Sequence, residues 1–416
     1  MTVRRSAAAL TALTALAAAT AVLGGAAPAA FADGTPSPVA IPPGLYGTKD
    51  PQFDGVFRQS LAFLAQEKAN VKPAEQAIGW LAGQQCADGS FTSFRADTST
   101  ACDPKKLDTN ATAAAVQAFV AVGGHADAIK KGVTWLKSVQ QDDGGWPYTP
   151  GLGGSDANST AIAIGALAAA GEKPADVKSA KGGKTPFDAL LTFALPCDDP
   201  GGPGAFAFQP DPKTQKLYAN ADATAAAVTG ALGKGLTATA GPADTKGTAC
   251  EKATTPEQAA HNGAAHLART LAPTGFLKTP PMPGAADQPD FGNTADAVVA
   301  LAAAGQSRQA KASADWLAKN AGPWAKESGP AAYAQLVFAA DATGADPSNF
   351  GGLNLVKSLN ATGPAPQSAV TSTPSAQTSQ SKDDDGISLW WIVGAGLVAG
   401  IGVGFLISGR KKNQQL

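Results

Sequence analysis

The chain has 416 residues, of which 44% are hydrophobic and 6% aromatic, and its 32 basic and 33 acidic side chains give a formal net charge of −1. A near-neutral chain with no basic stripe lacks the electrostatic footprint of nucleic-acid binding, so we expect no nucleic-acid partner. The length exceeds that of an ordinary single domain unless the domain is built from repeats.

Residues 1–32 have the pattern of a secretory signal peptide. Arg4 and Arg5 precede a long uncharged run of Ala, Leu and Val, and Ala30-Phe31-Ala32 supplies the small-x-small pattern that signal peptidase cuts. Cleavage there exports the chain. It leaves residues 33–52 as an N-terminal segment before the first helix.

Residues 53–362 contain a repeated helical segment with one template. Each copy opens with Asp or Asn, has Thr four residues later, and has Gly eleven residues after that Thr. The copies open at Asp108, Asp156, Asn220 and Asp290, and their threonines are Thr112, Thr160, Thr224 and Thr294. A fifth, degenerate copy runs from Gly329 to Gly344 with Tyr333 in the Thr position.

The template predicts buried helices. The opening residue is a good N-cap and the final Gly is a good C-terminal signal. Past their first turn, the four copies carry one Asp and one Lys, so they are apolar nearly all round and we expect them inside the domain.

Amphipathic, better-charged helices alternate with these copies, beginning near Pro73, His125 and Ser307. Two of them run into loops with identical offsets, and the matching residues are Trp80, Gln85, Gly89 and Phe91 in one, and Trp135, Gln140, Gly144 and Trp146 in the other. Six buried and six outer helices predict an all-α fold, an α6/α6 toroid over residues 53–362. We expect its first inner helix at about residues 53–66.

Four cysteines in an exported chain suggest two disulfides. Cys86 and Cys102 flank one loop and form the favoured pair, which leaves Cys197 with Cys250 by elimination. A zinc site is the competing interpretation, but the chain has no CxxC and only three histidines. We therefore expect disulfides.

The C-terminal part predicts a membrane anchor. Residues 363–386 are rich in Pro, Ser, Thr and Gln and read as a flexible stalk. A helix over the uncharged residues 387–408 would be about 33 Å long, enough for a hydrocarbon core of about 30 Å. The basic tail, residues 409–416, belongs in the cytoplasm. We expect a single-pass protein of the cell membrane, with the helical domain outside and the C-terminus inside.

The predicted membrane helix also suggests association. Gly396, Gly400 and Gly404 form a GxxxGxxxG face, which permits close approach of two helices in lipid. We expect self-association or docking on another membrane protein through this face. The alternative is that Gly is simply common in such helices.

Over about residues 53–360 the repeats resemble the α/α toroid of the terpenoid cyclase and protein prenyltransferase superfamily, which also includes cobalamin carriers such as intrinsic factor and transcobalamin. The Trp-Leu-x3-Gln-x3-Gly-x-aromatic units look like the QW repeats of squalene cyclases. Such units stabilise the ring and identify a fold rather than a reaction. Packing is therefore the expected role of Trp80, Trp135, Trp146 and Trp316.

The enzyme branches of that superfamily are disfavoured. The ring contains neither the DxDD acid of class II cyclases nor a DDxxD cluster for prenyl diphosphate, and its histidines do not fit the zinc site of farnesyl transfer. We assign no catalytic residue or metal site and expect no required cofactor.

Cobalamin carriers fit better. In that family polar groups at the starts of inner helices face the ligand, and the resemblance places Asp108, Thr112, Asp156 and Thr160 against corrin amides. The repeat extends this expectation to Asn220, Thr224, Asp290, Thr294 and Tyr333. We expect the aromatic residues of the loops either to line the mouth of the pocket or simply to cover the ring. These residues are Trp146, Tyr148, Phe206, Phe208 and Tyr218. Capping alone would also account for Asp or Asn at these helix starts. Asn110 and Asn158 match the N-glycosylation sequon, but they lie within the repeat template, so we expect no glycan there.

The expected function is therefore a membrane-anchored extracellular binding protein that captures a ligand for uptake, with cobalamin or a related corrinoid as first candidate. Those carriers clamp their ligand with a second, β-rich domain, so a separate β-domain protein or an uptake transporter is the expected partner. Two alternatives stay open, an enzyme acting on an envelope glycan or lipid and a structural scaffold. The close acidic pairs for such an enzyme are Asp142 with Asp143 and Asp198 with Asp199.

Overall fold

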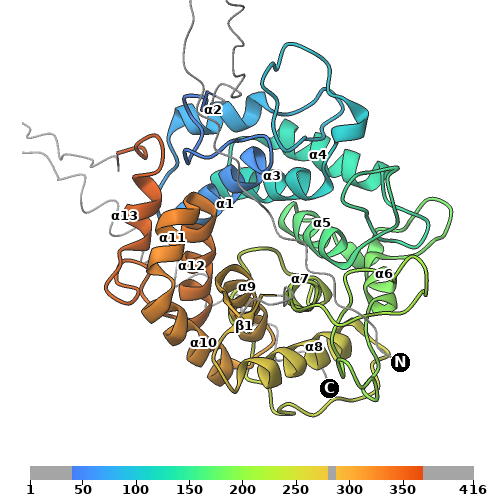
Figure 1. Cartoon of the computed structure of the whole chain (residues 1–416). Coiled ribbons are helices and arrows are strands. Elements are labelled where there is room, and N and C mark those ends of the chain that lie inside the picture. Colours follow the sequence, from blue (N-terminus) through green and yellow to red (C-terminus); the bar gives the residue numbers. More distant parts are fainter. Residues whose placement is uncertain (1–39, 280–286, 369–416) are drawn as a thin grey trace, which may run out of the picture. The chain divides into compact units, whose positions relative to one another are not determined.

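The computed structural model describes residues 40–279 and 287–368, and this part of the chain is all-α (Figure 1). It contains 13 α-helices and two short 3-10 turns, η1 (Pro104–Lys106) and η2 (Pro174–Asp176). Its strands β1 (Leu277–Lys278) and β2 (Pro289–Asp290) form one antiparallel pair. None of the helices within these two ranges is long and apolar enough to cross a bilayer.

Several predicted segments lie outside the described residues. These are the signal peptide, most of the stalk, the membrane helix at residues 387–408, the basic tail, and the glycine face formed by Gly396, Gly400 and Gly404. Their assignments stay predictions.

Six helices surround the centre of the described domain. They are α1 (Gly55–Lys68), α3 (Thr109–Val122), α5 (Ala157–Ala169), α7 (Ala221–Ala231), α9 (Phe291–Ala303) and α12 (Pro330–Thr343). Each packs against the next in this order, and α12 packs against α1, so the circuit of contacts closes on itself (Figure 1). We call these the inner helices.

The other helices lie outside this circuit (Figure 1). They are α2 (Glu75–Gly83), α4 (Ala126–Ser138), α6 (Pro186–Thr192), α8 (Pro256–Leu271), α10 (Ser307–Asn320) and α13 (Leu355–Asn360), with α11 (Gly322–Ser328) between α10 and α12. Each of the six packs against the inner helix that precedes it in the chain. The predicted alternation of buried and outer helices is thus observed.

The predicted N-caps are confirmed in all four full copies. A side-chain oxygen of Asp108, Asp156, Asn220 and Asp290 accepts the backbone N–H three residues on, at 2.9, 2.7, 2.8 and 3.0 Å respectively. Such a bond satisfies one of the N–H groups that have no partner within the helix.

The repeated threonine fastens the preceding loop to its inner helix. Thr224 Oγ1 accepts from the backbone N–H of Phe206 at 3.0 Å, while the Phe206 carbonyl accepts from the N–H of Asn220 at 2.9 Å. Corresponding N–H to Oγ1 bonds join Phe91 to Thr112, Trp146 to Thr160 and Leu277 to Thr294. We call this two-residue attachment the threonine clamp.

The matching loops that follow α2 and α4 have the same internal bonds. Gln85 Nε2 donates to the Gly89 carbonyl at 3.0 Å, and Gln140 Nε2 donates to the Gly144 carbonyl at 2.8 Å. Gly144 has a φ of +93°, and a Cβ there would overlap the Thr185 carbonyl, so only glycine fits. The aromatic residues at the ends of these loops, Phe91 and Trp146, are fully buried.

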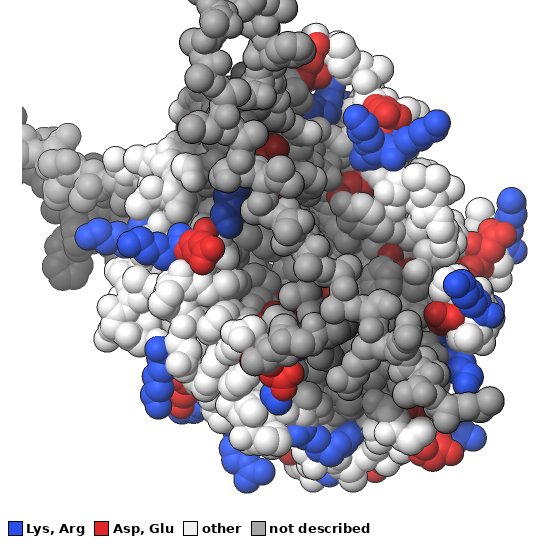
Figure 2. Space-filling model, in the orientation of Figure 1, with Lys and Arg blue, Asp and Glu red and all other residues white. Residues whose placement is uncertain are grey.

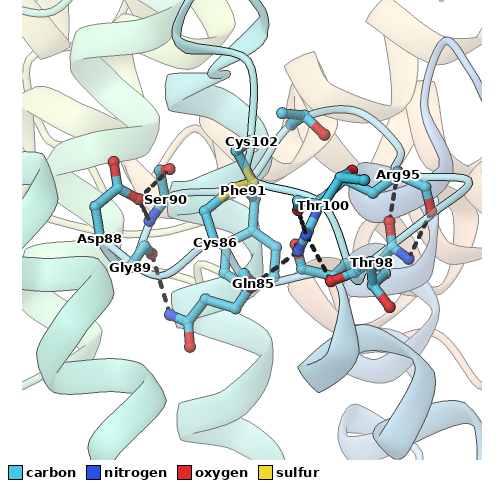
Figure 3. Close-up of a disulfide and its surroundings, with 12 residues drawn as sticks. Gln85, Cys86, Asp88, Gly89, Ser90, Phe91, Arg95, Thr98, Thr100 and Cys102 are labelled. Atoms are coloured by element: carbon cyan, nitrogen blue, oxygen red, sulfur yellow. Dashed lines mark hydrogen bonds between the residues drawn. A yellow bond between two sulfur atoms is a disulfide. The ribbon is translucent and has the colours of Figure 1, made fainter.

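Both predicted disulfides form. Cys86 is bonded to Cys102, and the loop between them is held by Arg95, whose guanidinium donates to the carbonyls of Thr98 at 2.8 Å and Thr100 at 2.7 Å (Figure 3). These disulfides indicate an extracellular or otherwise oxidising environment.

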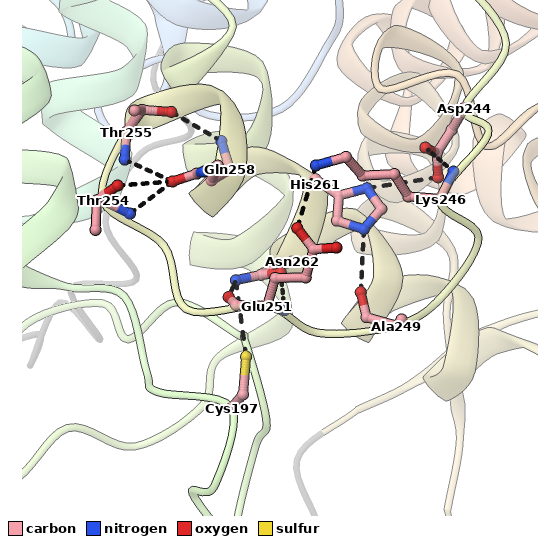
Figure 4. A network of polar contacts seen from close by, with 10 residues as sticks. All are labelled: Cys197, Asp244, Lys246, Ala249, Glu251, Thr254, Thr255, Gln258, His261 and Asn262. Atoms are coloured by element: carbon pink, nitrogen blue, oxygen red, sulfur yellow. Dashed lines mark hydrogen bonds and ion pairs between the residues drawn. The ribbon is translucent and has the colours of Figure 1, made fainter.

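The second disulfide, Cys197 to Cys250, joins the loop after α6 to the loop before α8. Polar contacts hold the second loop to α8 and include a 3.0 Å bond from the Glu251 N–H to Asn262 Oδ1 (Figure 4). The His261 ring lies between the Ala249 carbonyl at 3.0 Å and the Asp244 carboxylate at 3.5 Å (Figure 4).

The edges of the domain extend beyond the predicted limits of 53 and 362. Tyr46 is fully buried, and its hydroxyl donates to the Pro364 carbonyl at 3.0 Å. The Gln367 N–H donates to the Lys72 carbonyl at 3.1 Å. Residues 40–52 and 363–367 therefore pack on the helices, because the two ends of the closed circuit meet there.

Candidate functional site

A cavity of about 160 Å³ lies at the centre of the inner helices. All six contribute to its wall, and the lining residues are Phe57, Leu61, Asn110, Asn158, Ala161, Ile162, Asp222, Ala225, Ala226, Thr229, Asp296, Val299, Gln335 and Phe338, with Lys234, Gly235 and Leu236 from the loop after α7. We call it the central cavity.

Helical spacing explains which residues reach it. In α7 the lining positions are Asp222, Ala225, Ala226 and Thr229, which recur every three or four residues and share one face. Thr224 comes two residues after Asp222, so it lies about 200° around the helix and points toward the loops instead. The threonine clamp and the cavity wall are thus opposite faces of the same helices.

The segment of residues 234–239 closes the cavity at the C-terminal ends of the inner helices, and we call it the floor. The Leu236 N–H donates to Gln117 Oε1 at 2.9 Å, and a Cβ on Gly165 would lie 2.6 Å from the Cα of Gly235. The third repeat therefore differs from the prediction. Its helix ends at Ala231, and Gly235 belongs to the floor because only a residue without a side chain fits against Gln117.

Two carboxylates face the cavity, each held by an amide. Asn158 Nδ2 donates to Asp222 Oδ2 at 2.7 Å, and Gln335 Nε2 donates to Asp296 Oδ2 at 2.9 Å. The four residues come from α5, α7, α9 and α12, so the arrangement exists only when the circuit of helices is closed.

The enclosure makes both acids harder to ionise. Burial, with the nearby charge of Asp222 as the second cause, raises the pKa of Asp296 to about 7. Burial also raises the pKa of Asp222, against the opposing hydrogen bond from Asn158. Groups with such shifts inside a cavity are frequent at functional sites.

Two of the lining residues carry a buried polar atom that has no partner among the described residues. Among the described residues, no hydrogen-bond donor reaches the buried oxygens Asn110 Oδ1 and Asn158 Oδ1. An acceptor left buried and unpaired costs roughly 1–3 kcal/mol. Two of the residues that line the central cavity therefore carry buried acceptors without a donor among the described residues.

None of the sequence-predicted ligand residues lines this cavity. Asp108, Asp156, Asn220 and Asp290 cap their helices, and Thr112, Thr160, Thr224 and Thr294 form the threonine clamps. Burial raises the pKa of both Asp108 and Asp156, while backbone N–H bonds at the caps oppose the shift. Tyr333 is buried in α12 and contributes to a separate surface depression near Leu353.

The loop aromatics divide into two groups. Trp146 and Phe206 are fully buried, and Trp146 Nε1 donates to the Leu136 carbonyl at 2.8 Å, so these two pack within the domain. Tyr148, Phe208 and Tyr218 are 48%, 39% and 60% exposed beside the starts of the inner helices. Burial of its ring, together with the charge of Asp108, raises the pKa of Tyr148 to about 12.

The acidic pairs noted in the loops form turns. Asp143 Oδ1 accepts from the Gly145 N–H at 2.9 Å and from Ser155 Oγ at 2.8 Å, while Asp199 Oδ1 accepts from the Gly201 N–H at 2.8 Å. These bonds stabilise local turns and place neither carboxylate in the cavity.

Sequence reasoning missed the cavity acids, although a signal was present. Asp296 and Lys234 are the two charges that break the apolar pattern of the repeats beyond the first turn. Asn110, Asn158 and Asp222 all stand two residues after their caps, the same position in three successive copies. A comparison of that position between copies would have identified the cavity wall.

Charged side chains of both signs lie on the surface of the described domain. On the face shown in Figure 2, basic and acidic side chains alternate around the circumference of the domain. Within residues 40–279 and 287–368, no group of three His, Cys, Asp or Glu side chains is arranged to hold a metal ion.

Comparison of the sequence with protein-family models and with curated proteins finds no match for this chain.

Proposed function

We propose that this chain is an exported binding protein whose α6/α6 toroid captures a small molecule in the central cavity. The observation that carries this proposal is a cavity shared by all six inner helices, with the carboxylates of Asp222 and Asp296 in its otherwise largely apolar wall. Binding sites commonly combine an apolar wall with a few convergent polar groups. The disulfides support a location outside the cytoplasm, and the apolar segment 387–408 supports membrane anchoring.

The resemblance to cobalamin carriers extends the proposal to a corrinoid. Pockets for drug-sized ligands have volumes of about 300–1,000 Å³, so a corrin ring cannot be enclosed in a cavity of about 160 Å³. A corrinoid would instead lie over the starts of the inner helices, where Tyr148, Phe208 and Tyr218 are exposed. A separate β-domain protein or a transporter docked through the glycine face would complete that arrangement.

Small-molecule capture predicts that a residue filling the cavity blocks binding. The purified full-length chain is screened by thermal shift against compounds of up to about a dozen heavy atoms, and binders are titrated by calorimetry. Ala226→Leu, on the cavity face of α7, should weaken binding at least tenfold because its side chain occupies the ligand volume. The matched control is Ala312→Leu on the exposed face of α10, which should bind as the parent does.

A binder that is unaffected by Ala226→Leu would place the site elsewhere, and the absence of any binder would contradict capture. Cobalamin is titrated in parallel. An unchanged cobalamin absorption spectrum in the presence of the protein would contradict the corrinoid extension.

An enzyme acting on an envelope glycan or lipid is the second candidate, and the pair Asp222 and Asp296 favours it. Such chemistry uses one acid that is protonated near neutral pH beside one that is ionised. The raised pKa of Asp296 fits the first role. Turnover of a bound compound by the parent, lost in both Asp222→Asn and Asp296→Asn, would favour this candidate over simple capture.

A further inference from the structure

Two carboxylates, those of Asp222 and Asp296, are the acidic groups in the wall of the central cavity. Asn158 Nδ2 donates to the Asp222 carboxylate, and a carboxylate only accepts, so the opposite atom of that amide must be oxygen. This oxygen, Asn158 Oδ1, is buried with no donor among the described residues. Asn110 Oδ1, at the equivalent position of the neighbouring inner helix, is likewise buried with no donor among the described residues. Neither oxygen is exposed to the cavity, so the two carboxylates are the acceptors that a ligand would meet.

The same wall carries negative charge without a basic counterpart. Of the described residues that line the cavity, Lys234 is the one basic residue, and its Nζ donates to the Thr239 carbonyl at 3.1 Å on the exposed side of the floor. Interaction with a helix N-terminus accounts for Asp222, which lies in the first turn of α7. It does not account for Asp296, which lies in the second turn of α9.

The remainder of the wall is apolar. Phe57 and Leu61 of α1, Val299 of α9 and Phe338 of α12 surround the polar groups. A ligand that fits must therefore present several N–H donors and a positive charge at one end, with a hydrocarbon body at the other.

We propose that the central cavity binds the ammonium group of a small primary amine, with the carboxylates of Asp222 and Asp296 as its acceptors. This inference rests on the proposed capture function and names its ligand class. An ammonium group offers three donors and no acceptor, which complements this wall. Charge-assisted bonds to carboxylates are the stronger kind of hydrogen bond.

The cavity volume sets the size of the amine. A cavity of about 150 Å³ in another protein holds benzene, and the cavity here has about 160 Å³. Benzylamine is therefore a suitable probe. Benzyl alcohol and benzoate have nearly the same shape with a neutral and a negative head group.

The three probes are titrated into the purified full-length chain at pH 8, where Asp296 is largely ionised. We expect benzylamine to bind at least tenfold more tightly than benzyl alcohol, and benzoate to show no binding. Asp222→Asn and Asp296→Asn should each weaken benzylamine at least tenfold and benzyl alcohol by a smaller factor, because Asn keeps an oxygen that accepts from a hydroxyl. Asp315→Asn, an exposed acid on α10, is the matched control and should change neither. Circular dichroism checks that each variant is folded.

Each failure has a distinct meaning. Equal affinity for benzylamine and benzyl alcohol would overturn the ammonium inference and leave capture in the cavity standing. The ammonium inference would also be overturned, with capture still standing, if none of the three probes bound while other compounds from the screen bound to the parent and were weakened by Ala226→Leu. Competition by millimolar Na⁺ or Mg²⁺ would assign the acceptors to a metal ion and would also overturn the inference. If no compound binds at all, both proposals fall.

Discussion

Asp296 shows at the scale of one residue how the central cavity departs from a structural core. A carboxylate in the interior of an apolar helix destabilises the folded state when it is ionised, because it loses its hydration. The hydrogen bond that Gln335 Nε2 donates to Asp296 Oδ2 offsets part of that lost hydration. A leucine or alanine would suit the neighbouring apolar wall better, so the acid is unfavourable for stability and is expected to serve binding.

The raised pKa of Asp296 makes a prediction about stability and pH. Between about pH 4 and 7 the folded state binds a proton at this site that the unfolded state has released. The free energy of unfolding of the parent therefore falls as the pH rises over this range, and the fall is complete above about pH 7. Asp296→Asn removes the ionisable group. We expect the variant to gain roughly 2–3 kcal/mol relative to the parent between pH 5 and pH 8.

Urea unfolding of parent and variant at both pH values measures this difference. Titrating groups that do not interact with Asp296, such as His266, are present in both proteins and cancel in the comparison. Asp315→Asn is the control and should follow the parent at both pH values. A parent and an Asp296→Asn variant with parallel pH profiles would contradict the assignment of a perturbed acid at this position.

At the scale of the element, the repeated template encodes attachment of a loop to a helix. The Asp or Asn caps the inner helix, and the Thr four residues later accepts the N–H of the loop residue that precedes it. Both bonds are made by every full copy, whereas the cavity position two residues after the cap changes from Asn to Asp and Gly between copies. The template therefore reports on structure, and variation between copies reports on the site.

The threonine clamp can be tested by an isosteric change. In Thr224→Val the buried Phe206 N–H loses its acceptor, and we expect a loss of about 1–3 kcal/mol in the free energy of unfolding. Thr224→Ser keeps the hydroxyl and is the matched control, with a smaller loss limited to one methyl group. Urea unfolding measures both. If Thr224→Val lost little stability while Thr224→Ser lost more, packing of the methyl group, and not the hydrogen bond, would matter at this position.

At the scale of the whole molecule, closure of the circuit creates the cavity and the floor limits it. The two ends of the domain meet through Tyr46 and Pro364, and through Gln66, whose Nε2 donates to Asn360 Oδ1 at 2.8 Å. The Cys197–Cys250 disulfide spans 53 residues and links the loops on either side of α7 and the floor. These long-range contacts hold the six inner helices around one space.

Two glycine substitutions in helices should have opposite effects on stability, because only one of these glycines packs against the floor. Gly79→Ala on the exposed side of α2 meets no atom within 4 Å and should stabilise the protein by about 0.5–1 kcal/mol, as expected for helical glycine. Gly165→Ala in α5 would place its Cβ 2.6 Å from the Gly235 Cα. It should cost about 1–3 kcal/mol because the floor must move.

Unfolding by urea compares the two glycine variants, and small-molecule titration of Gly165→Ala reports whether the displaced floor alters the cavity. If Gly165→Ala stabilised the protein as much as Gly79→Ala, the close contact between α5 and the floor would be absent in solution.

The sequence by itself determined the alternation of buried and outer helices, the N-caps of the repeated helices and the two disulfides. These features depend on interactions within a few residues, such as a cap and its N–H three residues on, or on the pairing of just four cysteines. Hydrophobic periodicity also predicted which helices are buried. It did not predict which face of each helix points inward, because the buried helices are apolar nearly all round.

Only the tertiary structure decided where the site lies. Asp222, Asp296, Asn158 and Gln335 belong to four different helices, and each looks like an isolated polar residue in the sequence. In the closed circuit these four positions face the central cavity. The Thr positions of the repeat, which are the same in every full copy, face the loops instead. The physical reason is that a cavity is enclosed by residues distant in the chain, whereas a cap or clamp is specified locally and repeats wherever the local fold repeats.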